Sequence, residues 1–275
     1  MDLQYIKDLP LGGFSYENCL RNKALIDSKS LGANQVQHMK TGTTICGAVF
    51  KDGVVLAADT RATGGSTVGD KNCEKIHYMA PNIRTCGAGT AADCDHVTEN
   101  MRRELEMHRL NTHSENRVQM VAGKLAANAF KYGGNLGTHL IVGGVDVKGP
   151  QLIEVSNDGN CYAFPFLTMG SGCLAAMGIM ETQYRETMTE EECKALCIAA
   201  IEAGVYHDLG SGSNVDCCVI KRGKVEMFRN IKSDNHKVYS KPGGYSFSKD
   251  RVQVLEEYKQ KLVVEEAAQP MDLSA

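Results

Sequence analysis

Thr43, preceded by Gly42, stands directly before an apolar run in the sequence MKTGTTICGAVF (39–50). A threonine hydroxyl is a weak nucleophile unless a neighbouring base removes its proton. If the chain is cut between Gly42 and Thr43, the new α-amino group has an ordinary pKa of about 7.7–8.0 and can act as that base. The alternative interpretation is a strand start with a polar lead-in, which is the commoner meaning of Thr-Thr before an apolar run.

Two sets of polar residues follow at a spacing of two, which places side chains on one face of a strand. The sets are Asp59, Arg61 and Thr63, and then Cys73, Lys75 and His77. A buried Lys75 beside Asp59 stays charged and lowers the pKa of a nearby hydroxyl or amino group. Taken alone, the first set is equally typical of a solvated strand end, and the second of a surface stripe.

The sequence CGAGTAADCD, at residues 86–95, predicts a strand, a glycine turn and the start of a helix. Its glycines expose backbone N–H groups at a helix N-terminus, and such groups suit a developing oxyanion. An ordinary strand-to-helix turn has the same composition, so this motif is not specific by itself.

Strand and helix patterns surround these motifs and predict the scaffold that positions them. The expected strands and strand runs are 44–50, 54–60, 71–80, 83–90, 138–147, 150–166 and the hairpin 215–228. The expected helices are 91–110, 116–132, 173–186 and 190–207, the last with a capping box formed by Thr189 and Glu192. Strand runs grouped with helix pairs indicate two sheets covered by helix layers, an α+β or layered α/β core.

The composition bears on several classes of function. The 275 residues are 43% hydrophobic and 23% charged, with a net charge of −3. No Lys/Arg block stands out and no apolar run reaches the length of a membrane span, so no nucleic-acid or membrane partner is expected. The N-terminus has no secretory signal pattern. The 11 cysteines include no CxxC pair and no metal-ligand spacing, so reduced thiols in the cytosol or nucleus are expected, without a metal.

Changes in character along the chain indicate three regions. Residues 1–42 show no sustained period and are expected to be a leader that forms no domain of its own. Residues 43–230 carry the strand and helix patterns of the core. After about Arg229 the chain becomes polar and rich in turns, so residues 231–275 are expected to form a C-terminal arm on a partner surface.

Taken together, three motifs resemble the catalytic beta subunits of the 20S proteasome, which are N-terminal threonine hydrolases. The motifs are TGTTICGAVFKDGVVLAADTRAT, KNCEKIHYMAPNIRTCGAGTAAD and GSGSNVDCCVI. The resemblance covers residues 40–230 and is closest to the trypsin-like type. It implies a four-layer αββα sandwich, with two antiparallel sheets between helix layers, in a chain that is an unprocessed precursor with residues 1–42 as propeptide.

The resemblance also implies the roles of the catalytic residues. Autolysis between Gly42 and Thr43 would expose Thr43, which would supply both the nucleophilic hydroxyl and the amino-group base. Lys75 would tune the pKa of this nucleophile, and Asp59 would pair with Lys75. The N–H of Gly89 would donate to the oxyanion.

Further roles come from the same resemblance. Ser171, Asp208 and Ser211 would hold the amino group of the nucleophile and its water. Arg61 would be structural. Thr63 and Ala91 would bind the substrate backbone in the manner of a neighbouring strand.

A specificity pocket is expected beside this site. Gly87 would leave its neck open, and Asp95 lies one helical turn after Ala91, so both share a helix face. Cys73 and His77 would flank the lysine between them. A deep pocket with a carboxylate favours Arg or Lys before the cleaved bond, because an unpaired buried charge is costly.

The function implied is a threonine endopeptidase that cleaves unfolded polypeptides after basic residues in ubiquitin-dependent degradation. It would act without a cofactor, with other alpha and beta subunits in stacked seven-membered rings, in the cytoplasm and nucleus. Two alternatives are a non-catalytic structural beta subunit of the same particle and a hydrolase that uses a cysteine. Cys46 departs from the small apolar residue usual in the family and is interpreted as a core residue.

Overall fold

The computed structural model describes residues 16–27, 41–232, 240–241, 243–246 and 255–263. Contacts along the chain divide it into two units, Met1–Asn235 and His236–Ala275. The helices and strands described below all belong to the first unit.

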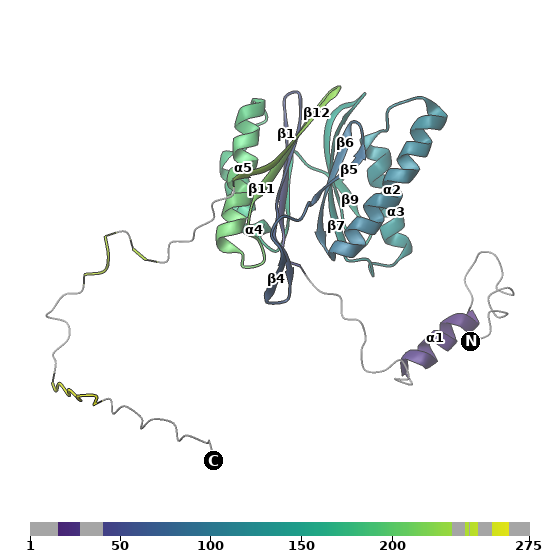
Figure 1. The fold of residues 1–275 in the computed structure, drawn as a ribbon. Coiled ribbons are helices and arrows are strands. Elements are labelled where there is room, and N and C mark those ends of the chain that lie inside the picture. Colours follow the sequence, from purple (N-terminus) through teal and green to yellow (C-terminus); the bar gives the residue numbers. More distant parts are fainter. Residues whose placement is uncertain (1–15, 28–40, 233–239, 242, 247–254, 264–275) are drawn as a thin grey trace, which may run out of the picture. The chain divides into compact units, whose positions relative to one another are not determined.

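Two five-stranded antiparallel sheets lie face to face (Figure 1). The first contains, in spatial order, β10 (Phe166–Gly170), β1 (Thr44–Phe50), β2 (Gly53–Asp59), β11 (Val215–Lys221) and β12 (Lys224–Lys232). The second contains β5 (Ile76–Ala80), β6 (Ile83–Gly89), β7 (Thr138–Asp146), β8 (Gly149–Val155) and β9 (Cys161–Ala163). A separate hairpin follows β2 and is formed by β3 (Ala62–Gly64) and β4 (Thr67–Asp70).

A pair of helices covers the outer face of each sheet (Figure 1). The helices on the first sheet are α4 (Cys173–Gln183) and α5 (Glu190–His207). Those on the second sheet are α2 (Ala91–Thr112) and α3 (Val118–Lys131). This arrangement is the four-layer αββα sandwich of the N-terminal nucleophile hydrolases, so the predicted fold class is confirmed.

Apolar residues fill the space between every pair of layers, and strand β2 shows how the sequence achieves this. The strand is buried along its whole length. Val55 and Ala57 pack toward the helices, while Val54 and Leu56 pack toward the opposite sheet. A strand with both faces covered needs no polar alternation, which explains the continuous apolar run at this position.

The capping box predicted at the start of the 190–207 helix is confirmed. Thr189 Oγ1 accepts a hydrogen bond from the backbone N–H of Glu192, and the Glu192 carboxylate accepts one from the N–H of Thr189. The Lys51–Gly53 and Arg222–Gly223 turns connect the expected strand pairs. Two ion pairs at helical spacing, Glu99 with Arg103 and Glu106 with Arg109, lie on α2.

One predicted strand boundary is wrong, and two other elements differ in extent from the sequence patterns. The strand expected over 71–80 begins only at Ile76, because Cys73 donates its N–H to the carbonyl of Thr60 instead of joining the sheet ladder (3.0 Å). Residues before Thr43 include a helix, α1 (Tyr16–Asp27), although this part of the sequence shows no sustained period. Strand β12 continues to Lys232, four residues beyond the end of the hairpin expected over 215–228.

The remaining expectations about the ends of the chain fall largely outside the described residues. Within the described part, no helix is long and apolar enough to cross a membrane. All of the cysteines are free thiols, and most of them are buried. Burial raises the pKa of the Cys46 thiol, which agrees with its interpretation as a core residue.

Candidate active site

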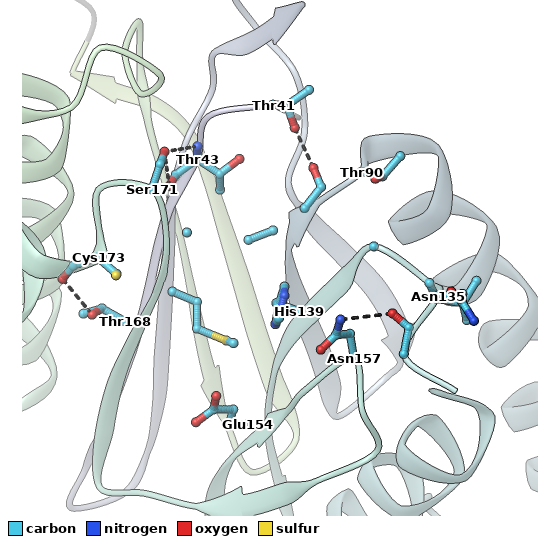
Figure 2. A pocket seen from close by; sticks show the side chains of 17 residues that line it. Thr41, Thr43, Thr90, Asn135, His139, Glu154, Asn157, Thr168, Ser171 and Cys173 are labelled. Carbon is cyan, nitrogen blue, oxygen red and sulfur yellow. Dashed lines mark hydrogen bonds between the residues drawn. The ribbon is translucent and has the colours of Figure 1, made fainter. Parts of the chain in front are cut away.

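Thr43 lies at the entrance to strand β1, with its side chain and backbone both engaged (Figure 2). Its Oγ1 donates a hydrogen bond to the carbonyl of Gly42 (2.7 Å) and accepts one from Lys75 Nζ (3.0 Å). Its backbone N–H donates to Ser171 Oγ (3.0 Å). Only 3% of the residue is exposed, so the hydroxyl is held in one orientation in a water-poor site.

Lys75 uses all three of its N–H donors at this site. They bond to Asp59 Oδ1 (2.7 Å), Thr43 Oγ1 (3.0 Å) and the carbonyl of Gly42 (3.3 Å). The side chain is 7% exposed and that of Asp59 is fully buried. A single cation therefore contacts both the hydroxyl and the carbonyl oxygen on either side of the Gly42–Thr43 bond.

Asp59 ends strand β2, and both of its carboxylate oxygens are surrounded by donors. Oδ1 accepts from the N–H of Thr44 (2.9 Å) and from Lys75, while Oδ2 accepts from the N–H of Gly212 (3.1 Å) and of Arg61 (3.2 Å). Burial raises the pKa of the Asp59 carboxyl, and the Lys75 ammonium opposes this shift. A protonated carboxyl would find no acceptor among these partners, so the site is built for the carboxylate.

Ser171, Asp208 and Ser211 form one hydrogen-bonded group beside Thr43, and Ser171 is the member that contacts the Thr43 nitrogen. Asp208 Oδ2 accepts from Ser171 Oγ (2.5 Å) and from Ser211 Oγ (2.7 Å). Ser211 Oγ also lies 2.7 Å from Thr44 Oγ1. Partial burial raises the pKa of Asp208, but these hydrogen bonds outweigh it, so the pKa lies below its ordinary value.

Gly89 and Thr63 bind the two residues before Thr43. Thr63 Oγ1 accepts from the N–H of Gly42 (2.9 Å), and the Gly89 carbonyl accepts from Thr41 Oγ1 (2.7 Å). Gly89 has a φ of 124°, and a Cβ at this position would lie 2.1 Å from the carbonyl oxygen of Gly137. Only glycine fits there, which keeps the backbone of this strand end accessible to a peptide.

Arg61 supports the loop that carries Ser211. Its Nη1 donates to the carbonyl of Leu209 (3.1 Å), and a Cβ on Gly212 would collide with its guanidinium group. This hydrogen bond joins Arg61 to the loop and not to Thr43; a structural role is what the resemblance implies for it.

A cavity of about 270 Å³ opens beside the lysine and contains all the residues expected in the specificity pocket. These are Cys73, Lys75, His77, Gly87, Ala91 and Asp95. The expected reason for their proximity is wrong for two of them, because Cys73 and Lys75 precede strand β5 and do not share a strand face with His77. Asp70 and Glu74 also line the cavity, and sequence patterns gave no sign of these two carboxylates.

His77 and Asp95 face each other across this cavity, with 3.8 Å between Nδ1 and Oδ1. Burial lowers the pKa of His77, and the carboxylates of Asp95 and Glu74 oppose the shift. A Cβ on Gly87 would lie 3.2 Å from Cys94 Sγ and 3.6 Å from His77 Nε2, so a larger residue would narrow the cavity. The pocket thus combines an open neck with several carboxylates.

Three contacts at the site were not predicted. Thr41 bonds to Gly89, Thr44 bonds through its backbone to Asp59, and the N–H of Gly212 bonds to the same carboxylate. The run Thr41-Gly42-Thr43-Thr44 was a visible signal for the first two. Among the described residues, no group of three or more His, Cys, Asp or Glu side chains is arranged to hold a metal ion.

Comparison with known proteins gives a consistent set of similarities. A family model described as "Proteasome subunit" matches residues 39–220. The chain is 49% identical over 240 residues to proteasome subunit beta type-7-B of Arabidopsis thaliana, covering 87% of this chain and 86% of that protein. It is 44% identical over 268 residues to beta type-10 of Mus musculus, covering 96% and 97%. It is 42% identical over 248 residues to beta type-2 of Saccharomyces cerevisiae, covering 90% and 94%.

Proposed function

The chain belongs to the proteasome subunit family, with relatives named as beta subunits, and from this we propose that it is a catalytic beta subunit. It is a threonine endopeptidase with trypsin-like specificity, made as a precursor and matured by its own cleavage at the Gly42–Thr43 bond. The observation that carries the proposal is the position of Lys75 Nζ, in contact with Thr43 Oγ1, Gly42 O and Asp59 Oδ1 at once.

Maturation begins when Thr43 Oγ1 attacks the Gly42 carbonyl carbon. The negative charge that develops on the Gly42 oxygen is stabilised by the Lys75 ammonium, which already bonds to that oxygen. The proton lost by Oγ1 passes to the nitrogen of Thr43, the C–N bond breaks so that this nitrogen leaves as an amine, and an ester joins Gly42 to the hydroxyl oxygen. Water hydrolyses this ester and leaves a carboxylate on Gly42 and a free α-amino group on Thr43.

Peptide cleavage uses the same atoms with the amine now free. The α-amino group accepts the proton of Thr43 Oγ1 as the oxygen attacks the substrate carbonyl, and then donates it to the leaving amine. Ser171 keeps the amino nitrogen in place, since it already bonds to this nitrogen in the uncut chain. The N–H of Gly89 donates to the oxyanion, and water then hydrolyses the acyl-enzyme.

The 270 Å³ cavity accounts for a preference for Arg or Lys before the cleaved bond. Asp95, Asp70 and Glu74 all line it, and a basic side chain is stabilised by these carboxylates where a neutral one is not. Unfolded polypeptides are the substrates, because two residues of an extended chain, Thr41 and Gly42, already occupy the site through backbone and short side-chain contacts.

The organisation of the chain follows from the same proposal. Residues 1–42 are the propeptide, 43–230 are the hydrolase core, and 231–275 form an arm on a neighbouring subunit. The subunit works with other alpha and beta subunits in stacked seven-membered rings, in the cytoplasm and nucleus. A non-catalytic subunit is the competing function, and a complete Thr43, Lys75 and Asp59 constellation argues against it.

Two measurements on assembled particles test the proposal. The intact mass of the subunit should correspond to a chain that starts at Thr43, and peptides with Arg before the scissile bond should be hydrolysed. Particles with Thr43→Ala should retain the propeptide and lose this hydrolysis, whereas Thr43→Ser, which keeps a hydroxyl, should retain part of both activities. Equal hydrolysis by the wild type and Thr43→Ala would establish the non-catalytic function instead.

A further inference from the structure

A second and larger cavity, of about 710 Å³, lies between the two sheets and opens beside Thr43 (Figure 2). Ser171 and Thr43 line one end of it, and Figure 2 shows Glu154 toward the other end, with His139 between. Its volume falls in the range of pockets that bind small ligands or side chains. The cavity is not needed for the specificity pocket described above, which lies on the other side of Gly89.

Glu154 and His139 interrupt an otherwise apolar layer. Glu154 shares its face of β8 with Leu152, and it pairs in register with Ile141 of β7; both of these apolar residues belong to the cluster between the sheets. His139 lies two residues before Ile141 on the same face. Apolar side chains therefore fill the space between the sheets next to this cavity, and His139 and Glu154 lie where this packing meets the cavity.

Neither of these two side chains has a hydrogen bond or ion pair within the described part of the chain. Both are half-buried. A carboxylate withdrawn from water without a partner is unfavourable, and a ligand that supplies a positive charge or N–H donors relieves this cost. Asn135 and Asn157 in the same wall donate their side-chain amides to backbone carbonyls, so they do not serve Glu154.

The chemistry of the proposed function indicates which part of a substrate reaches this cavity. The side chain before the cleaved bond occupies the pocket that contains Lys75. The leaving amine must lie next to the nitrogen of Thr43 that protonates it, and this nitrogen is held by Ser171. Since Ser171 lines the 710 Å³ cavity, the residues after the cleaved bond are directed toward it.

We propose that this cavity binds a basic side chain from the substrate segment after the cleaved bond, and that Glu154 is the residue that selects it. His139 adds a polar group to the wall, and Leu136 and Met169 contact the aliphatic part of the side chain. The inference rests on the proposed peptidase function. It adds a second requirement to that function, a basic residue on each side of the bond.

Paired substrates test the inference without any variant. All carry Arg before the cleaved bond, and they carry either Lys or its uncharged analogue norleucine at the first or second position after it. Wild-type particles should cleave one of the lysine peptides with a kcat/KM about tenfold above its norleucine partner, which corresponds to the low end of the couplings measured for close charge pairs at an interface. Equal kcat/KM values at both positions would overturn the inference.

Variants then assign the preference to the carboxylate. Glu154→Gln keeps the size of the side chain and should bring the lysine-to-norleucine ratio of kcat/KM close to one. Glu181→Gln, on the exposed face of α4, is the matched control and should keep the wild-type ratio. An unchanged ratio in Glu154→Gln particles would show that another group makes the selection and would overturn the role of Glu154.

The same assay separates failure of the inference from failure of the proposed function. Loss of the function would appear as no cleavage after Arg in any peptide, or as equal cleavage by Thr43→Ala particles. Failure of the inference alone would appear as Thr43-dependent cleavage with identical rates for lysine and norleucine peptides.

Discussion

Replacing Asp59 by Asn tests whether the buried carboxylate is what makes Lys75 effective. The change keeps the size of the side chain and its Oδ1 acceptor for Thr44. It places an NH2 group where Oδ2 now accepts from Gly212 and Arg61, so donors face donors. It also removes the charge 2.7 Å from Lys75 Nζ.

The size of the effect follows from these contacts. Removing one partner of a buried ion pair typically costs about 3–5 kcal/mol, which is a large part of the roughly 5–15 kcal/mol that stabilises a folded domain. Without the charge of Asp59 the Lys75 ammonium is held less firmly, so its stabilisation of the oxyanion that develops on the Gly42 oxygen during maturation is weakened. Loss of one oxyanion donor typically slows catalysis about 10²–10³-fold, and maturation should slow by up to this factor. Peptide cleavage should also slow, because Lys75 Nζ holds the Thr43 hydroxyl (3.0 Å).

The assay measures the fraction of subunits that start at Thr43 in assembled particles, and the rate of cleavage after Arg. Asp52→Asn is the matched control, because Asp52 lies exposed in the turn between β1 and β2. Asp59→Asn particles that mature and cleave within about twofold of the wild type would refute the reasoning. Such a result would mean that Lys75 is oriented by its contacts to the threonine and the glycine carbonyl alone.

Two further predictions concern the surroundings of Lys75 and the specificity pocket. Arg229 donates to the carbonyl and the side-chain oxygen of Asn72 (both 2.9 Å), and it forms ion pairs with Glu74 (3.2 Å) and the buried Asp216 (2.9 Å). Arg229→Gln should therefore raise KM for Arg peptides more than it lowers kcat, and it should lower the unfolding temperature of the particle. An unchanged KM would show that the 72–74 segment needs no such anchor. Burial lowers the pKa of His77 below 6.5, so this side chain is neutral at pH 7 and becomes charged only on acidification. The charged imidazolium repels a basic substrate side chain and weakens the attraction of that side chain to Asp95. The ratio of cleavage after Arg to cleavage after norleucine should therefore fall as the pH decreases below 6.5 in the wild type, and His77→Gln should remove this fall; a ratio independent of pH in the wild type would contradict the prediction.

The fold could be predicted from the sequence wherever a local signal decides the structure. The Asp52-Gly53 turn and the capping box of Thr189 and Glu192 are such signals, because each is formed by neighbours in the chain. The strand expected over 71–80 shows the limit of this approach. Cys73, Lys75 and His77 do alternate in the sequence as they would along a strand. The conformation of residues 71–75 is nevertheless decided by contacts with Thr60 and Arg229, which are distant in sequence.

For the candidate site too, residues with a local sequence signal could be predicted, and residues brought together by the fold could not. The motif around Thr43, Lys75 and Asp59 was visible because each residue sits beside a recognisable strand. The resemblance to a family supplied Ser171 and Asp208. No periodicity links Thr43 to Ser171, which lies 128 positions later in the chain, or to the Asp208 that binds this serine. Glu154 was missed because its strand reads as an ordinary amphipathic one, in which an acidic residue is expected to face water; the second sheet that encloses it comes from another part of the chain.

The contact of Lys75 with both the Thr43 hydroxyl and the Gly42 carbonyl has one more consequence under the proposed self-cleavage. The first bond that each molecule hydrolyses is its own, and it does so only if its lysine, aspartate and threonine are correctly placed. The position at which a chain begins is therefore a permanent record of whether its active site has ever worked. In a mixed population of particles, counting cut and uncut chains would measure the competent fraction directly, even after all substrate is gone.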